Sequence, residues 1–137
     1  TLAQADETAD IDLASVKIVA LANSTSEKFV KNFMSKAQLV TTKDYDEAVN
    51  MVLDGSATAM VADFPICALS VMRYADQGLV SLAEPLTIEP IGVAISPGDS
   101  LLLNFIENYL GALEVVGVLA ELEAKWFEDG GWLINLP

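Results

Sequence analysis

The sequence predicts an α/β domain with a mostly parallel sheet flanked by helices, followed by two C-terminal helices. Short apolar runs alternate with amphipathic helical patterns from residue 16 to residue 96, which is typical of parallel strands joined by crossover helices. Residues 97–137 instead hold two helical patterns with no strand between them. We therefore expect a polar lead-in segment (1–15), an α/β lobe (16–96) and a C-terminal helical segment (97–137).

Local patterns place the individual elements. Residues 16–22 (VKIVALA) form a continuous apolar run, as expected for a strand buried on both faces. Ser24 or Thr25 with Glu27 shortly after is a helix-start signal, and Gly117 is expected to break the last helical stretch. The expected strands lie at 16–22, 37–42, 56–64, 79–82 and 91–96. The first expected helix begins near residue 24, and four further helices are expected over 44–53, 65–74, 101–116 and 118–127.

Composition excludes several functional classes. The hydrophobic fraction of 53% argues against disorder, and no apolar run reaches the roughly 18–20 residues needed to cross a bilayer. A formal charge of −13 disfavours nucleic acid and anionic membrane surfaces as partners. The chain has no histidine and one cysteine, Cys67, so zinc sites, Ser-His or Cys-His catalysis and disulfide frameworks lack their parts. We expect no metal and no cofactor.

The turn Asn23-Ser24-Thr25-Ser26 ends the first predicted strand. Ligands of open α/β sheets bind at the carboxyl ends of strands, facing helix N-termini. The free N–H groups and partial positive charge of such a terminus suit a carboxylate or a phosphate, and Ser and Thr hydroxyls add donors. An ordinary helix cap uses the same residue types, and the local pattern alone favours the cap.

Asp63 ends the third predicted strand, directly before Phe64-Pro65. Its carboxylate would accept hydrogen bonds from an ammonium group, or it would cap the helix that begins at Pro65; the sequence supports both roles equally. Together with the turn at 23–26, Asp63 would provide donors for a carboxylate and an acceptor for an amine. A free α-amino acid requires both.

Four motifs in order, NSTSEKF, DYDEAVNMVLDGSATAMVADFP, IGVAISPGD and KWF, carry a family resemblance. Over roughly residues 12–129 the chain resembles the second lobe and C-terminal helices of the bacterial family 3 extracellular solute-binding proteins, which have the type II periplasmic binding fold. The resemblance implies that Ser24 and Thr25 bind the ligand carboxylate and that Asp63 binds its amino group. Asn23 stands where the family has glycine. Pocket selectivity is expected around Thr42 and Phe64.

The resemblance further implies a non-enzymatic, extracytoplasmic binding component of an ABC-type amino-acid transporter, with an ABC permease as its partner. A sensor module of the same fold and a cyclohexadienyl dehydratase-like enzyme are the alternatives, although Asp63, Glu84 and Glu89 have no identifiable partner for acid catalysis. No signal peptide is visible at Thr1.

The family's first lobe, which supplies an arginine for the ligand carboxylate, has no counterpart in this sequence. The apolar faces of the two C-terminal helices then lack the surface on which they pack in the family. An exposed apolar face of this kind favours association, so we expect self-association through these helices, including exchange of helices between two copies.

Overall fold

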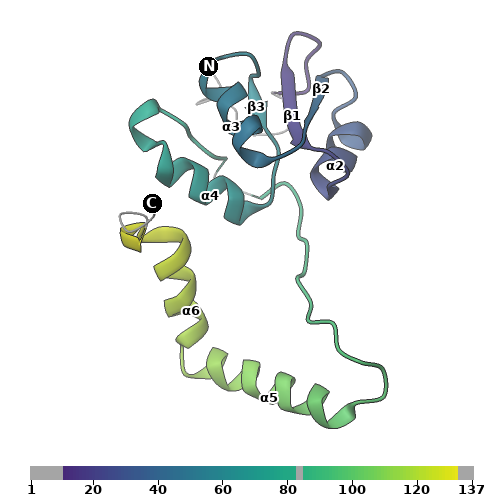
Figure 1. Cartoon of the computed structure of the whole chain (residues 1–137), viewed down its shortest axis with the longest axis vertical. Helices are drawn as coiled ribbons and strands as arrows, with labels where there is room; N and C mark the ends of the chain where they lie inside the picture. Colours follow the sequence, from purple (N-terminus) through teal and green to yellow (C-terminus); the bar gives the residue numbers. More distant parts are fainter. Residues whose placement is uncertain (1–10, 83–84, 133–137) are drawn as a thin grey trace. The chain divides into compact units, whose positions relative to one another are not determined.

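The computed structural model describes residues 11–82 and 85–132 (Figure 1). Its sheet contains β1 (Lys17–Leu21), β2 (Gln38–Thr42) and β3 (Ala59–Met60), all parallel, in the order β2-β1-β3. Helices α2 (Thr25–Phe33) and α3 (Tyr45–Leu53) connect these strands, and α4 (Phe64–Arg73) with the short η2 (Ala75–Gln77) follows β3. The predicted α/β class with a parallel sheet is confirmed.

The central strand β1 is buried on both faces, as its continuous apolar run predicted. Successive side chains of a strand point to opposite faces, so Ile18 and Val19 enter different cores. Ile18 packs with Val30 and Met34 of the α2 side, whereas Val19 packs with Ala48 of α3 and with Ala57. Both strand residues are fully inaccessible, which makes β1 the element that holds the lobe together.

Three of the predicted strands were wrong in part or entirely. The third strand was expected over 56–64 but comprises only Ala59–Met60, although the N–H groups of Thr58 and Val61 still donate to β1 carbonyls at 2.8 and 3.0 Å. The segments 79–82 and 91–96 form no strand. A strand needs a hydrogen-bonded neighbour, and among the described residues no segment pairs with the outer edge of β3. The apolar side chain of Ile91 is accordingly 95% exposed.

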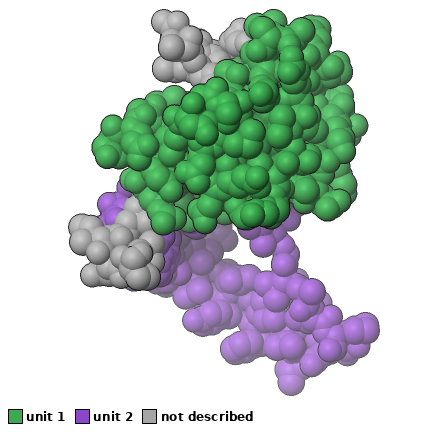
Figure 2. All heavy atoms as spheres, turned by 45° about the horizontal axis from the view of Figure 1, so that its top comes forward, with its two compact units in different colours: residues 1–86 green, residues 87–137 purple. Residues whose placement is uncertain are grey.

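The chain divides into two compact units, residues 1–86 (unit 1) and residues 87–137 (unit 2), which Figure 2 colours separately. The domain boundary at 96/97 that the sequence suggests stays a prediction.

Unit 2 contains α5 (Ser100–Val115), α6 (Val118–Glu123) and the π-helical turn η3 (Ala124–Glu128). The predicted break at Gly117 is confirmed, since this glycine has a left-handed φ of 82° between the two helices. No single described helix is long and apolar enough to cross a membrane. Helix α5 reaches that length and apolar character only together with α6 and η3, and this pair is bent by 80° at the break between them. Exposed large apolar side chains lie along these helices: Leu101, Leu102, Leu103, Phe105, Tyr109, Leu110, Val115, Val116, Leu119, Leu122 and Trp126.

Candidate functional site

The carboxyl ends of β1, β2 and β3 lie at one edge of the sheet because the three strands are parallel. A helix starts directly after each strand, with Ser24, Asp44 and Asp63 at the N-cap positions of α2, α3 and α4. Three helix N-termini with their partial positive charges therefore share this edge with the candidate residues. This is where ligands bind in open parallel sheets.

The turn after β1 forms the predicted capping box. The Ser24 hydroxyl donates to the carbonyl of Leu21 at 2.7 Å and accepts from the N–H of Glu27 at 3.1 Å. Glu27 reaches back and accepts from the N–H of Asn23 at 2.6 Å. The cap interpretation therefore holds for the Ser24 side chain, whose only hydroxyl proton is committed within the turn.

Asn23 has a φ of 63°, the one left-handed residue other than glycine in the described chain. Asparagine is among the few residue types that adopt this conformation readily, so it fits a position where the resembled family has glycine. Beyond it, the backbone N–H groups of Thr25 and Ser26 form no hydrogen bond with the described residues. These N–H groups and the exposed Thr25 side chain are the donors that α2 leaves for an anion.

The turn after β2 repeats the same cap. Asp44 accepts from the N–H of Glu47 at 2.8 Å, and Glu47 accepts from the N–H of Lys43 at 3.2 Å. In both α2 and α3 a reciprocal pair of acidic or hydroxyl side chains thus satisfies two N–H groups at the helix start and leaves the N–H groups between them open.

The third N-terminus differs from the other two. The backbone carbonyl of Asp63 accepts from the N–H groups of Ile66 and Cys67 at 2.9 and 3.1 Å, but its side chain makes no capping hydrogen bond. The Asp63 carboxylate is exposed, and so is the neighbouring Phe64 ring, at 54%. The Asp63 carboxylate therefore does not cap its own helix, and it is free to accept hydrogen bonds from another partner.

Thr42, the last residue of β2, lies beneath this edge. Its side chain is only 3% exposed, and its hydroxyl oxygen has no hydrogen-bond partner among the described residues. Register pairs Thr42 with Leu21, so it lies level with the end of β1. The structure therefore brings Thr42 to the edge but not to the surface, and its ligand contact stays a prediction.

Cys67 and Tyr45 complete the description of this region. Burial raises the pKa of the half-buried Cys67 thiol, and its sulfur lies 3.6 Å from the carbonyl oxygen of Ala62. Burial also raises the pKa of Tyr45, and the negative charge of Asp63 raises it further. The sequence interpretation missed Tyr45, although its position directly after the Asp44 cap was a usable signal. In the described ranges no group of three His, Cys, Asp or Glu side chains is arranged to hold a metal ion.

No family model matches the chain. Over 113 residues it is 26% identical to the ABC transporter glutamine-binding protein GlnH of Bacillus subtilis (strain 168), a match that covers 82% of this chain and 41% of GlnH.

Two solved structures agree in fold and are more similar in sequence. An ancestral cationic amino-acid solute-binding protein, AncCDT-1, is 36% identical with a TM-score of 0.81, and the match covers 91% of this chain and 53% of that protein. An ABC-transporter binding component from Wolinella succinogenes DSM 1740, solved with lysine, is 32% identical with a TM-score of 0.80 over 95% of this chain and 56% of that one. The chain thus spans about half the length of these relatives. The resemblance to the family 3 solute-binding proteins is confirmed over that half, and the fold is that of a lobe of a type II periplasmic binding protein.

Proposed function

We propose that this chain provides one wall of a binding site for an α-amino acid, in the extracytoplasmic binding component of an ABC-type importer. The observation that carries the proposal is the uncapped Asp63 carboxylate at the same sheet edge as the free N–H groups of α2. The ammonium group of the ligand would bind Asp63, and its carboxylate would bind the Thr25 hydroxyl and the N–H groups of Thr25 and Ser26.

The remaining predicted residues have supporting roles in this proposal. Asn23 and Ser24 fix the turn that presents the N–H groups, and Phe64 offers an apolar surface beside Asp63. The interactions are hydrogen bonds and charge pairing, with no bond made or broken, so the chain acts as a binder and not as an enzyme. A permease would then receive the ligand from the complete binding protein.

We further propose that the ligand is a cationic amino acid. Acidic side chains gather at the helix starts of the edge: Asp44, Glu47 and Asp63, together with Glu27 and Asp46, which pair with Lys31 and Arg73. A second positive charge on the ligand is favoured by these groups and by the net charge of −13. The names of two relatives support the same class, because AncCDT-1 is a cationic amino-acid binder and the Wolinella protein was solved with lysine.

Titration of the isotope-labelled chain with L-lysine, L-arginine and L-glutamine, followed by amide NMR, tests the proposal. We expect shifts at Thr25 and Ser26 and weaker binding of glutamine. Asp63→Asn should weaken lysine binding by up to about fivefold, because an exposed ion pair contributes at most about 1 kcal/mol. Asp76→Asn, an exposed acid in η2 away from the edge, is the matched control. Equal lysine affinity of the Asp63 and Asp76 variants would contradict the proposed site.

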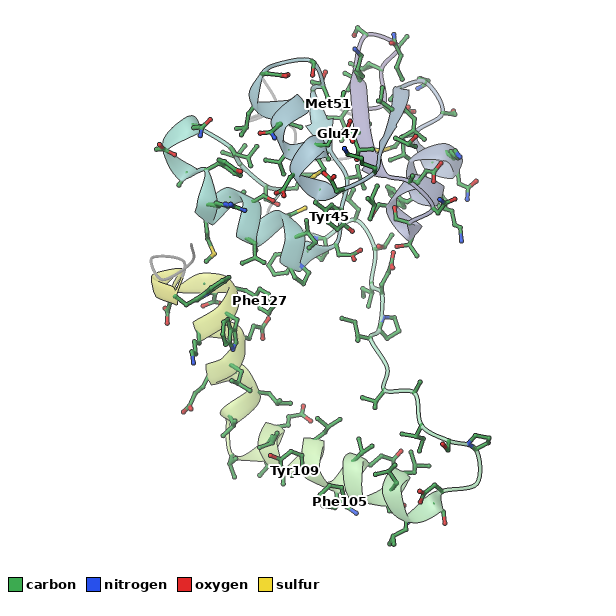
Figure 3. All side chains as sticks on the ribbon, viewed as in Figure 1. Tyr45, Glu47, Met51, Phe105, Tyr109 and Phe127 are labelled. Atoms are coloured by element: carbon green, nitrogen blue, oxygen red, sulfur yellow. The ribbon has the colours of Figure 1, made fainter. Side chains whose placement is uncertain are left out.

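We also propose that unit 2 associates with a second copy of the chain through the apolar faces of α5 and α6. Phe105 is 65% exposed, and its ring stacks on Tyr109, 6.0 Å away between centroids, so an aromatic pair lies on this face (Figure 3). Because each copy carries a charge of −13, salt should strengthen the association by screening repulsion. Light scattering should show a dimer whose fraction rises with salt, and Phe105→Glu should abolish it. A monomer at every protein and salt concentration would refute this proposal.

A further inference from the structure

The residues that follow η3 fold back onto it. The turn itself is π-helical, because the N–H of Asp129 donates to the carbonyl of Ala124, five residues earlier, at 2.9 Å. The chain then turns at Gly130, which has a left-handed φ of 62° that glycine adopts without steric cost. This turn brings Trp132 against Trp126 of η3.

Three contacts converge on Trp126. The indole N–H of Trp132 donates to the backbone carbonyl of Trp126 at 3.1 Å, and such carbonyls at a helix end otherwise lack a partner. The two indole rings form a tilted pair, with centroids 5.2 Å apart and planes at 59°. The ammonium group of Lys125 lies 4.9 Å from the centroid of the Trp126 ring, as in a cation–π contact.

Trp126 also belongs to the apolar face of α6. Spacings of three and four residues place Leu119, Leu122 and Trp126 on one side, and these residues are 36%, 42% and 42% exposed. Trp132 is less exposed than Trp126, in keeping with a ring that packs on this face. Trp132 therefore covers part of the surface through which unit 2 is proposed to associate.

We propose that residues 130–132 form a strap that limits the association of unit 2 by covering Trp126. This proposal rests on the proposed self-association. A second copy and Trp132 compete for the same ring, so the apparent affinity of the dimer falls with the fraction of copies whose strap is open. Replacing Trp132 should therefore strengthen the dimer, whereas replacing a tryptophan that belongs to the interface weakens it.

Circular dichroism of the chain tests whether the strap is closed. Trp126 and Trp132 are the only tryptophans in the sequence, and two adjacent tilted indoles give an exciton-coupled signal. Gly130→Ala keeps both indoles but strains the left-handed turn, so it should weaken this signal. Gly131→Ala is the matched control, because a Cβ at this position meets nothing within 4 Å and its φ is not left-handed. Absence of the signal in the unaltered chain, or equal weakening in both glycine variants, would overturn the strap.

Sedimentation of the same variants tests what the strap does. Gly130→Ala and Trp132→Ala should each lower the dissociation constant of the dimer about fivefold, because both destabilise the closed strap. Trp126→Ala should raise it at least fivefold, because it removes the ring that the second copy contacts. Gly131→Ala should leave it unchanged.

The outcomes separate the strap from the association itself. A dimer that Trp132→Ala weakens would overturn the strap, because Trp132 would then belong to the interface. Equal dissociation constants in the native chain and both strap variants would leave the association standing and overturn the strap. Association found only in the strap variants would support the strap and refute association of the native chain. If no variant associates at any concentration, the proposed association fails and the regulatory role fails with it.

Discussion

Thr42→Val should stabilise unit 1. The Thr42 side chain is only 3% exposed, and its hydroxyl has no hydrogen-bond partner among the described residues. Valine has the same branched shape and replaces the hydroxyl with a methyl group, so the packing of β2 against its neighbours is preserved. The substitution removes the cost of a desolvated polar group and leaves the strand otherwise unchanged.

The expected gain follows from two contributions. A buried polar group without a partner costs about 1–3 kcal/mol. Placing a methyl group in the same volume adds about 0.8 kcal/mol at most. Since strand packing limits how well the methyl group fits, we expect a net gain of about 1–2 kcal/mol, a factor of roughly 5–30 in the folded-to-unfolded ratio. Thr41→Val is the matched control, because Thr41 is exposed on the same strand and its replacement should change stability by less than about 0.5 kcal/mol.

Hydrogen exchange of the β1 amides is the appropriate assay. Trp126 and Trp132 both lie in unit 2, so tryptophan fluorescence would not report on unit 1. Ile18, Val19 and Ala20 are fully buried, and their amides should exchange about 5–30 times more slowly in Thr42→Val. Unchanged or faster exchange would refute the reasoning, because it would mean that the Thr42 hydroxyl is satisfied, for example by an ordered water molecule.

Three further predictions concern the turn after β1. Asn23→Ala should cost about 1–2 kcal/mol in thermal unfolding because of its left-handed φ of 63°, and Asn23→Gly should cost little or nothing. Ser24→Ala should cost about 1 kcal/mol in urea unfolding through the lost cap, whereas Thr25→Ala, at an exposed position, should change little. The hydrogen bond from Lys31 and then that from the Asn23 N–H lower the pKa of Glu27. The ionised Glu27 therefore stabilises the fold fully above about pH 4.5, and this stabilisation is lost as the pH falls through the lowered pKa. Amide exchange of α2 during acid titration measures this loss, and Lys31→Met should move it to higher pH.

The features predicted correctly from sequence depend on residues close together in the chain. The cap of α2 involves Ser24 and Glu27, which are only three positions apart in the chain. The break at Gly117 depends on the backbone freedom of one residue. Short-range interactions of this kind are fully specified by the local sequence, so pattern analysis finds them.

The errors concern interactions between distant segments. Residues 79–82 and 91–96 have the apolar, β-branched composition of strands, yet a strand exists only where a neighbour supplies hydrogen bonds. Val93 is 66% exposed, so the apolar composition of its segment did not indicate that the segment pairs with a neighbouring strand.

The edge described here offers a ligand polar partners on one side only. Small-ligand sites usually bury 70–90% of the ligand surface, but Asp63 is exposed and Phe64 is 54% exposed. An exposed ion pair contributes about 0–1 kcal/mol, far from the roughly 8 kcal/mol of micromolar binding. The same carboxylate would bind an ammonium group more strongly once a second surface excluded water, because its charge would no longer be screened. The residues of this edge therefore set which groups are recognised, whereas affinity must come mainly from the surface that covers them.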